Sequence, residues 1–434
     1  MAHVEPLTRA GTTHDLTGRV GRIGSGSAML VLGILALAGL IGLILKVMSG
    51  PVPLNKWGYT AAALAFLLST GQGMPVVAFA TRLAKGYWAL PLRRAAELGA
   101  VTGLVTTPLF IVLLFQLPDF FGRPSIWFDW PGGPVLWDSV AMILLTFTGL
   151  AMLFVSSRPD RALSTQQASD WPGTGRQWDV LTAGLVVLGA FYLMMLVFVH
   201  MYVVSDLGMS LVLGWRSAII PPYHAVSGLQ AGLATTLLVC GALRRFGGLR
   251  RYFGLDVFWG ASKLLLGLSL LFFYFTWSEL LTNWYGRTAD EQFLLDLFMF
   301  GPYTALFISS VLLNFALPLA LLIWNPIRVS VRGPIFVAGL ILLGNLIDRL
   351  RIFVASWSVA GPLGPHRTFA PPAQYPDALD LLVFVGAVSA VTFLYLLALR
   401  FVPPIAIWEF KTGLLLTAER PYLKTEVAVV AKPQ

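Results

Sequence analysis

Ten runs of mostly apolar residues constrain this chain more than any other feature. A helix needs about 20 such residues to cross the hydrocarbon layer of a membrane. In lipid, backbone groups must be hydrogen-bonded within their own segment, which a helix achieves. The sequence therefore predicts an all-α polytopic membrane protein with ten transmembrane helices, at approximately 27–46, 57–81, 94–117, 134–156, 178–202, 218–243, 256–284, 302–324, 334–357 and 378–401.

The composition excludes several other classes of protein. Hydrophobic residues make up 57% of the chain and charged residues 12%, whereas soluble domains carry about 25% charged residues. The net charge of +9 comes from basic residues at the ends of the apolar runs rather than in one domain, so nucleic acid is not an expected partner. Cys240 is the single cysteine, which excludes a disulfide framework and covalently attached haem c within the chain.

Lysine and arginine are distributed unevenly between the two sides of the predicted helices. Most of the 30 such residues lie on the side of the N-terminal tail, and Lys263, Arg349 and Arg351 fall within runs. The opposite loops hold Lys46, Lys56, Arg123, Arg216, Arg287 and Arg367. Because cytoplasmic loops are enriched in lysine and arginine, both termini are predicted to be cytoplasmic.

This topology divides the chain into three parts. Residues 1–26 form a cytoplasmic N-terminal tail, 27–402 the transmembrane domain, and 403–434 a cytoplasmic C-terminal tail. The aromatic residues of FVPPIAIWEF, where this last tail begins, predict that it lies along the inner membrane surface.

The outer loops are rich in tryptophan and aspartate, as in the segments 119–138 and 284–296. Such loops either anchor the chain at the lipid headgroups or dock an extramembrane partner.

Ionisable residues gather near the outer ends of four predicted helices. His200, Asp206 and His224 surround the outer turn between two runs. Glu279 lies in the outer third of the seventh run, and Asp348, Arg349 and Arg351 lie in that of the ninth. Charges within a membrane are costly, so a chain that keeps several together uses them.

Two interpretations of this outer cluster stay open, and both can hold. In the structural one, Asp348 or Glu279 neutralises Arg349 or Arg351. In the functional one, the cluster is a proton or quinone-headgroup site, because histidines and carboxyls can bind quinone carbonyls and exchange protons. His200 and His224 do not predict haem b, since no companion pair exists at the other surface, and no spacing of histidine, cysteine and aspartate predicts a metal site.

Two further polar residues lie away from the outer cluster. Gln72 is at the middle of the second run, between Gly71 and Gly73, where its amide either bonds a neighbouring helix or lines a cavity. Glu97 lies near the inner surface beside Arg93 and Arg94. It either begins a helix as part of an ion pair or forms the inner mouth of a proton path.

A succession of motifs from about residue 55 to 357 resembles a known family. In order, it contains WGYTAAALAFLLSTGQG, LRRAAELGAV, GPVLWDSVAM, SSRPDRA, VHMYVVSDLGMSLVLGWRSAIIPPYHAVSG, FTWSELLTNWYG and GNLIDRLRIF. These resemble the NrfD-like, or polysulfide-reductase, membrane subunits. They are most similar to the ActC and ActF subunits of bacterial alternative complex III, a quinol:electron-acceptor oxidoreductase.

The resemblance implies two four-helix bundles, spans 2–5 and 6–9, flanked by spans 1 and 10, in a bacterial inner membrane. It implies an outer quinone site with no covalently bound cofactor, and partner subunits that carry iron-sulfur clusters and haem c: an NrfD-like paralogue, an iron-sulfur protein and multihaem cytochromes. By position, His200, Asp206, Glu279, Asp348 and Arg349 match polar residues of the family's quinol site or proposed proton route.

One departure from the family pattern shapes the expected function. Relatives that oxidise quinol have a histidine in the turn where this chain has Gly71, Gln72 and Gly73. Glutamine cannot accept a proton, so the resemblance favours ActF, acting as scaffold and proton conduit rather than as the site of menaquinol oxidation. The alternative is a stand-alone secondary transporter, whose substrate would bind at the membrane midplane.

Overall fold

A computed structural model describes residues 9–20, 24, 26–51, 53–117, 133–165, 171–360, 369–422 and 425–430. Within them, nine helices are long and apolar enough to cross a membrane. The chain is therefore a helical multi-pass membrane protein. The nine are Gly26–Met48, Leu54–Leu83, Tyr87–Leu114, Gly133–Ala162, Gly175–Leu211, Ile220–Phe246, Leu255–Gly286, Thr304–Ile323 and Ala378–Ala398.

Each of these helices coincides with one of the predicted runs. Six correspond to α2 (Gly26–Met48), α7 (Gly133–Thr165), α8 (Gly175–Leu207), α9 (Ile220–Phe246), α10 (Leu255–Gly286) and α17 (Ala378–Ala398). The other three are composite and contain α3 (Gly58–Leu67) with α4 (Met74–Leu83), α5 (Leu90–Glu97) with α6 (Gly103–Leu114), and α12 (Thr304–Val311) with α13 (Leu317–Ile323).

The remaining predicted run, 334–357, is also helical but is not among the nine. It comprises α15 (Arg332–Arg349), the π-helical turn η10 (Leu350–Val354) and α16 (Ala355–Val359). Similar π-helical turns, η2 (Leu68–Gln72) and η9 (Leu312–Ala316), separate α3 from α4 and α12 from α13. Such turns are frequent at functional sites because they re-aim side chains.

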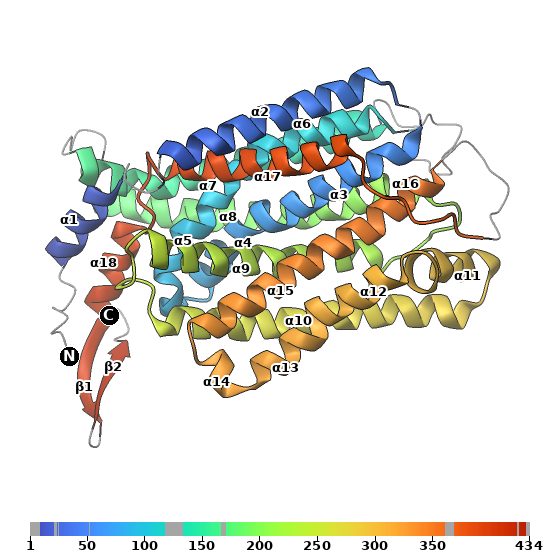
Figure 1. The fold of residues 1–434 in the computed structure, drawn as a ribbon. Coiled ribbons are helices and arrows are strands. Elements are labelled where there is room, and N and C mark those ends of the chain that lie inside the picture. The colour runs from blue at the N-terminus through green and yellow to red at the C-terminus, as the bar shows by residue number, and fades with distance from the viewer. Residues whose placement is uncertain are drawn as a thin grey trace.

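Short elements follow at the two ends of the helices (Figure 1). One end carries α1 (Arg9–Arg19), α18 (Ile407–Leu416) and an antiparallel hairpin of β1 (Thr417–Tyr422) and β2 (Thr425–Val430). The opposite end carries α11 (Ala289–Leu295), whereas α14 (Asn325–Arg328) links α13 to α15. The hairpin is a departure from the all-α prediction. The outer-loop segments 118–132 and 361–368 lie outside the described residues.

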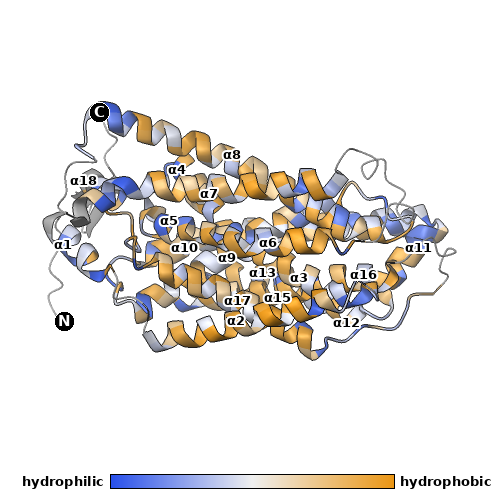
Figure 2. Ribbon diagram, turned by 90° about the horizontal axis from the view of Figure 1, so that it is seen from above, coloured by the Kyte–Doolittle hydropathy of each residue, from blue (hydrophilic) through white to orange (hydrophobic). Residues whose placement is uncertain are grey.

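The helices pack in two neighbouring sets. In the first, α4 contacts α5 and α8, and α7 contacts α6 and α8; in the second, α9, α10, α13 and α15 contact one another. The sets meet where α9 crosses η2, α4 and α8, and where α3 contacts α15 and η10. Hydrophobic side chains occupy the middle of the helices, while hydrophilic residues gather near α18 and near α11 (Figure 2).

The first and last crossing helices, α2 and α17, pack against each other (Figure 1). Their closest approach is at Gly39 and Gly386, where a Cβ on either residue would overlap the backbone of the other. Small residues allow such close helix crossings in membranes. The buried ion pair of Lys46 and Asp380 joins the same two helices.

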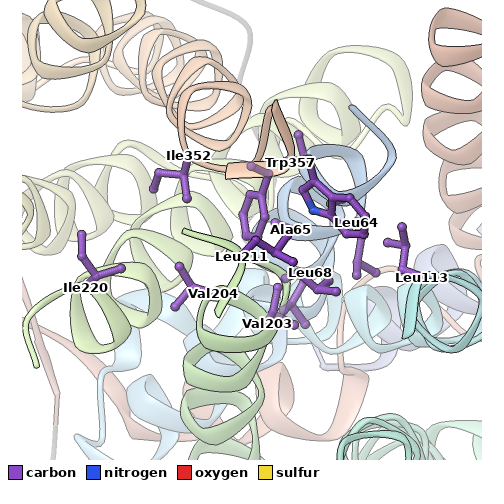
Figure 3. Close-up of a cluster of buried hydrophobic side chains, with 14 of the residues drawn as sticks. Leu64, Ala65, Leu68, Leu113, Val203, Val204, Leu211, Ile220, Ile352 and Trp357 are labelled. Carbon is purple, nitrogen blue, oxygen red and sulfur yellow. The ribbon is translucent and has the colours of Figure 1, made fainter. Parts of the chain in front are cut away.

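The enclosed core lies around the second crossing helix. Of its most apolar window 94% is buried, against 17% for α2 and for α17, whose exposed leucine and isoleucine side chains suit lipid. Side chains from four of the crossing helices, and from η10 and α16, converge there (Figure 3): Leu64, Ala65, Leu68, Leu113, Val203, Val204, Ile220, Ile352 and Trp357, with Leu211 beside them. The polar residues described next lie against this core.

Candidate functional site

Two buried histidines meet where the two sets of helices join. The ring centroids of His200 on α8 and His224 on α9 are 5.2 Å apart. His200 Nδ1 donates to the carbonyl of Leu196 at 2.9 Å, and its Nε2 lies 3.4 Å from Ser69 Oγ. No hydrogen bond of good geometry reaches either ring nitrogen of His224 among the described residues. Nε2 of His200 is therefore the nitrogen placed to exchange a proton.

Arg349 links these histidines to the ninth predicted span. Its Nη2 donates to Ser227 Oγ at 2.7 Å, to Ser69 Oγ at 3.1 Å and to the carbonyl of His224 at 3.3 Å. The guanidinium is fully buried. A charge this far from water is tolerated only when several groups solvate it, so the three oxygens hold Arg349 between the two sets of helices.

Two glycines of α9 allow this close approach. A Cβ at Gly228 would overlap the ring of His200. A Cβ at Gly232 would lie 2.7 Å from Gly73 Cα of the second crossing helix, a separation that real Cβ atoms do not adopt. The glycines of the motif around Gln72 and of the segment after His224 are therefore needed for packing.

Asp348 neutralises both arginines of its helix. Its Oδ1 lies 2.8 Å from Arg351 Nη2, and its Oδ2 lies 3.6 Å from Arg349 Nη1. Arg351 also donates to the carbonyl of Phe298 at 3.3 Å and lies over the ring of Phe307. The ion pairing considered for the outer cluster is present, with Asp348 as the carboxylate.

Glu279 is bound differently, although it is also buried. Its Oε2 accepts from Ser217 Oγ at 2.6 Å and its Oε1 from Asn283 Nδ2 at 3.0 Å. No cation lies within ion-pair distance of it in the part of the chain that the structure describes. Glu279, Tyr223 and Arg351 line one small pocket with a volume of about 20 Å³. A carboxyl held only by neutral donors can gain or lose a proton without breaking an ion pair.

Gln72 faces away from the histidines, toward the first set of helices. Its Oε1 accepts from Thr106 Oγ1 at 2.7 Å and its Nε2 donates to Thr146 Oγ1 at 3.3 Å. Tyr192 donates to its backbone carbonyl at 2.6 Å. Both ends of the amide are thus occupied by side chains of α6 and α7, which favours the interhelical interpretation of this residue.

Asp206 lies apart from the histidines as well, at the last turn of α8. Its carboxyl interacts with that of Asp138 near the start of α7. Both residues are at most 5% exposed. The two carboxyls therefore lie together at the ends of α7 and α8, away from the histidines.

Glu97 belongs to an ionic network at the opposite end of the helices. Its Oε1 lies 2.7 Å from Arg82 Nη2, and its Oε2 accepts from Ser156 Oγ at 2.6 Å. Arg94 pairs with Asp160 at 2.8 Å, and Arg82 pairs with Glu409 of α18 at 2.8 Å. The ion-paired interpretation of Glu97 agrees with these contacts, and the network fastens α18 to the crossing helices.

Neutral amides occupy the middle of the second set of helices. Gln230 Nε2 donates to Ser269 Oγ and to the carbonyl of Asn314, both at 2.9 Å. Asn314 and Asn345 donate to the carbonyls of Ser310 and Ser227. These contacts tie α9, α10, η9 and α15 together without a charge.

Sequence reasoning missed several residues that complete the site. Ser69, Ser217 and Ser227 bind Arg349 or Glu279, and Tyr223 lines the pocket. A lone serine or tyrosine in an apolar run carries no signal of this role. In the described residues, no group of three or more histidine, cysteine, aspartate or glutamate side chains is placed to hold a metal ion.

Comparisons with known proteins do not identify the chain. No family model matches it, and no curated protein matches it either.

Proposed function

We propose that the chain is an NrfD-like membrane subunit of a quinol:electron-acceptor oxidoreductase of the alternative complex III type, in a bacterial inner membrane. Its role there is that of scaffold and proton conduit. The motifs of residues 55–357 support the family, and the nine crossing helices agree with a multi-pass subunit.

The proposal includes a specific topology. All ten predicted runs cross the membrane, with α15, η10 and α16 as the ninth span, and spans 2–5 and 6–9 form two four-helix bundles. Spans 1 and 10 lie together beside them. Both termini are cytoplasmic because the basic residues favour that side. The contacts within the two sets of helices support this arrangement.

One observation carries the proton role: a chain of buried polar groups that crosses from one set of helices to the other. It begins at the pocket lined by Glu279 and Arg351. It continues through Asp348 to Arg349, which are 3.6 Å apart. From Arg349 it passes through Ser69 to His200, over distances of 3.1 and 3.4 Å. Arg349 and Arg351 stay protonated and hold the other groups in place. A proton would pass between the carboxyl, hydroxyl and imidazole groups through water.

The contacts of Gln72 favour the role of proton conduit rather than that of quinol-oxidising site. A quinone needs a hydrogen-bond partner at each carbonyl, but both ends of this amide are already bound to Thr106 and Thr146. Offering them to a quinone would break both of these hydrogen bonds, at a net cost of ~0.5–1.5 kcal/mol each. Menaquinol or another quinol is then oxidised to the quinone beside a partner subunit, and this chain receives the released protons near His200.

The redox cofactors belong to the partners in this proposal. An NrfD-like paralogue, an iron-sulfur protein and multihaem cytochromes c carry the electrons, since this chain offers only the buried Cys240 as a thiolate ligand. The lipid-exposed faces of the crossing helices bind lipids.

Purification from native membranes tests the proposal. The chain carries an affinity tag and is extracted in mild detergent. Cytochromes with haem c, seen in reduced-minus-oxidised spectra, and an iron-sulfur protein are expected to co-purify with it. The preparation should oxidise menaquinol. A chain that purifies alone, without haem, overturns the assignment to an oxidoreductase.

A stand-alone secondary transporter is the alternative function. The neutral amides Gln230, Asn314 and Asn345 in the middle of the helices favour a transporter, because transporters bind substrates at the midplane beside interrupted helices. Asn314 lies in the π-helical turn η9, which interrupts such a helix. Purification without partners, together with substrate-dependent uptake into proteoliposomes, would establish this alternative.

A further inference from the structure

A groove between α7 and α8 lies away from all the residues discussed so far. It has a volume of about 380 Å³ and lies near α18, whose Trp408 contacts Trp178 of α8. Its apolar wall is formed by Val155, Leu181, Gly184 and Leu188. A Cβ at Gly184 would meet no atom within 4 Å. The groove therefore has room for an elongated apolar group alongside the helices.

Two arginines stand at the mouth of this groove. Arg158 on α7 and Arg176 on α8 both line it and are exposed. Neither forms an ion pair with a carboxylate of the described residues. Arg158 lies over the ring of Trp171, 5.7 Å from its centroid. The mouth therefore carries two positive charges that the described carboxylates do not neutralise.

Uncharged donors add to the arginines at the mouth. Trp171 Nε1 is buried and has no hydrogen-bond partner in the ranges that the structure describes. Helix α8 begins there, capped at Gln177 N by Thr174. Because Thr174, Arg176 and Gln177 line the groove, the positive end of the helix dipole lies at the mouth and favours an anion.

The tryptophans near the groove indicate its depth in a membrane. The rings of Trp171 and Trp178 are 5.4 Å apart, and those of Trp178 and Trp408 are 5.6 Å apart. Tryptophan gathers at the level of the lipid headgroups. Basic pockets between membrane helices at that level bind the headgroups of anionic lipids.

We propose that this groove binds one anionic phospholipid. Its phosphate lies between Arg158 and Arg176 and accepts from Trp171 Nε1. One acyl chain lies along Leu181 and Leu188, over Gly184. A lipid fits better than free phosphate because the charged mouth continues into an apolar wall. The proposal does not depend on the redox assignment and requires only that the chain is embedded in a membrane.

Native mass spectrometry of the full chain tests this proposal, in whichever assembly it purifies. The protein is released from nanodiscs of equal phosphatidylglycerol and phosphatidylcholine, and the lipids retained are counted. Phosphatidylglycerol is expected to be retained preferentially. In Arg158→Gln/Arg176→Gln its affinity should fall about 30-fold, at roughly fivefold per basic residue. Gly184→Leu should also weaken retention, because it fills the groove without changing the charge.

Arg161→Gln is the matched control. Arg161 lies on α7 one turn beyond Arg158, is exposed and does not line the groove, so this variant should retain phosphatidylglycerol as the native chain does. Equal retention of the two lipids, or an equal loss in Arg161→Gln, overturns the proposal. Displacement of the lipid by inorganic phosphate alone, with no effect of Gly184→Leu, would show a free-phosphate site instead.

Discussion

Glu279 and Arg351 line the same pocket from different helices but do not pair with each other. The guanidinium of Arg351 pairs with Asp348, and the carboxyl of Glu279 is bound by Ser217 and Asn283. One cluster therefore holds one carboxyl in an ion pair and another that is bound only by neutral donors. In the proposed function, Glu279 is the carboxyl that exchanges a proton.

Replacing Glu279 with glutamine tests the proposed proton-exchanging group. Glutamine keeps one acceptor oxygen for Ser217 or Asn283 but cannot release a proton, so proton release by the assembled complex is expected to fall at least roughly tenfold. Quinol turnover and acidification of the outer medium are measured in proteoliposomes. Ser278→Ala, at the partly exposed neighbouring position on α10, serves as the control and should leave both rates unchanged.

The Asp348→Asn variant tests the structural ion pair. It leaves Arg349 and Arg351 buried without their counter-charge, which costs ~3–5 kcal/mol for a broken buried pair. The thermal unfolding midpoint in detergent should fall, with a loss of proton-coupled activity. Asp348→Asn/Arg351→Gln should regain part of the stability because it removes one uncompensated charge.

If proton release and turnover are normal in both Glu279→Gln and Asp348→Asn, the cluster has no functional role.

A third variant, Gln72→Leu, distinguishes a structural role of Gln72 from a role in binding quinol. The loss of both amide hydrogen bonds should destabilise the chain by ~1–3 kcal/mol, seen as a lower unfolding midpoint. Quinol turnover per folded complex should stay unchanged, since the amide binds Thr106 and Thr146 rather than substrate. A quinone headgroup found beside Gln72 and His200 in a well-resolved map of the complex would contradict this expectation.

At the opposite end, Glu409→Gln should release α18 from the crossing helices. Glu409 lies 2.8 Å from Arg82 and 3.6 Å from Arg93, and hydrogen bonds to charged groups contribute ~1.5–3 kcal/mol. Limited proteolysis of the C-terminal tail should become roughly tenfold faster. Lys411→Gln on the same helix is the control. Equal cleavage rates in the two variants would show that other contacts hold α18.

Much of the fold could be predicted, because apolar length is a local property of the sequence. Each of the nine crossing helices coincides with a predicted run. The outer cluster was only partly predictable. His200, His224 and Arg349 do meet, but Asp206 interacts with Asp138, and Gln72 faces Thr106. Depth along a helix follows from residue number, whereas the direction a side chain faces depends on which helices surround it.

The sequence by itself determined that this chain crosses a membrane as helices, since lipid leaves the backbone no other partner than its own helix. Tertiary structure alone decided which charges neutralise each other. Lys46 pairs with Asp380, and Arg82 pairs with both Glu97 and Glu409. Lys46 and Asp380, which are distant along the chain, lie on helices that approach closely at Gly39 and Gly386, and that complementarity of shape exists only in the packed molecule.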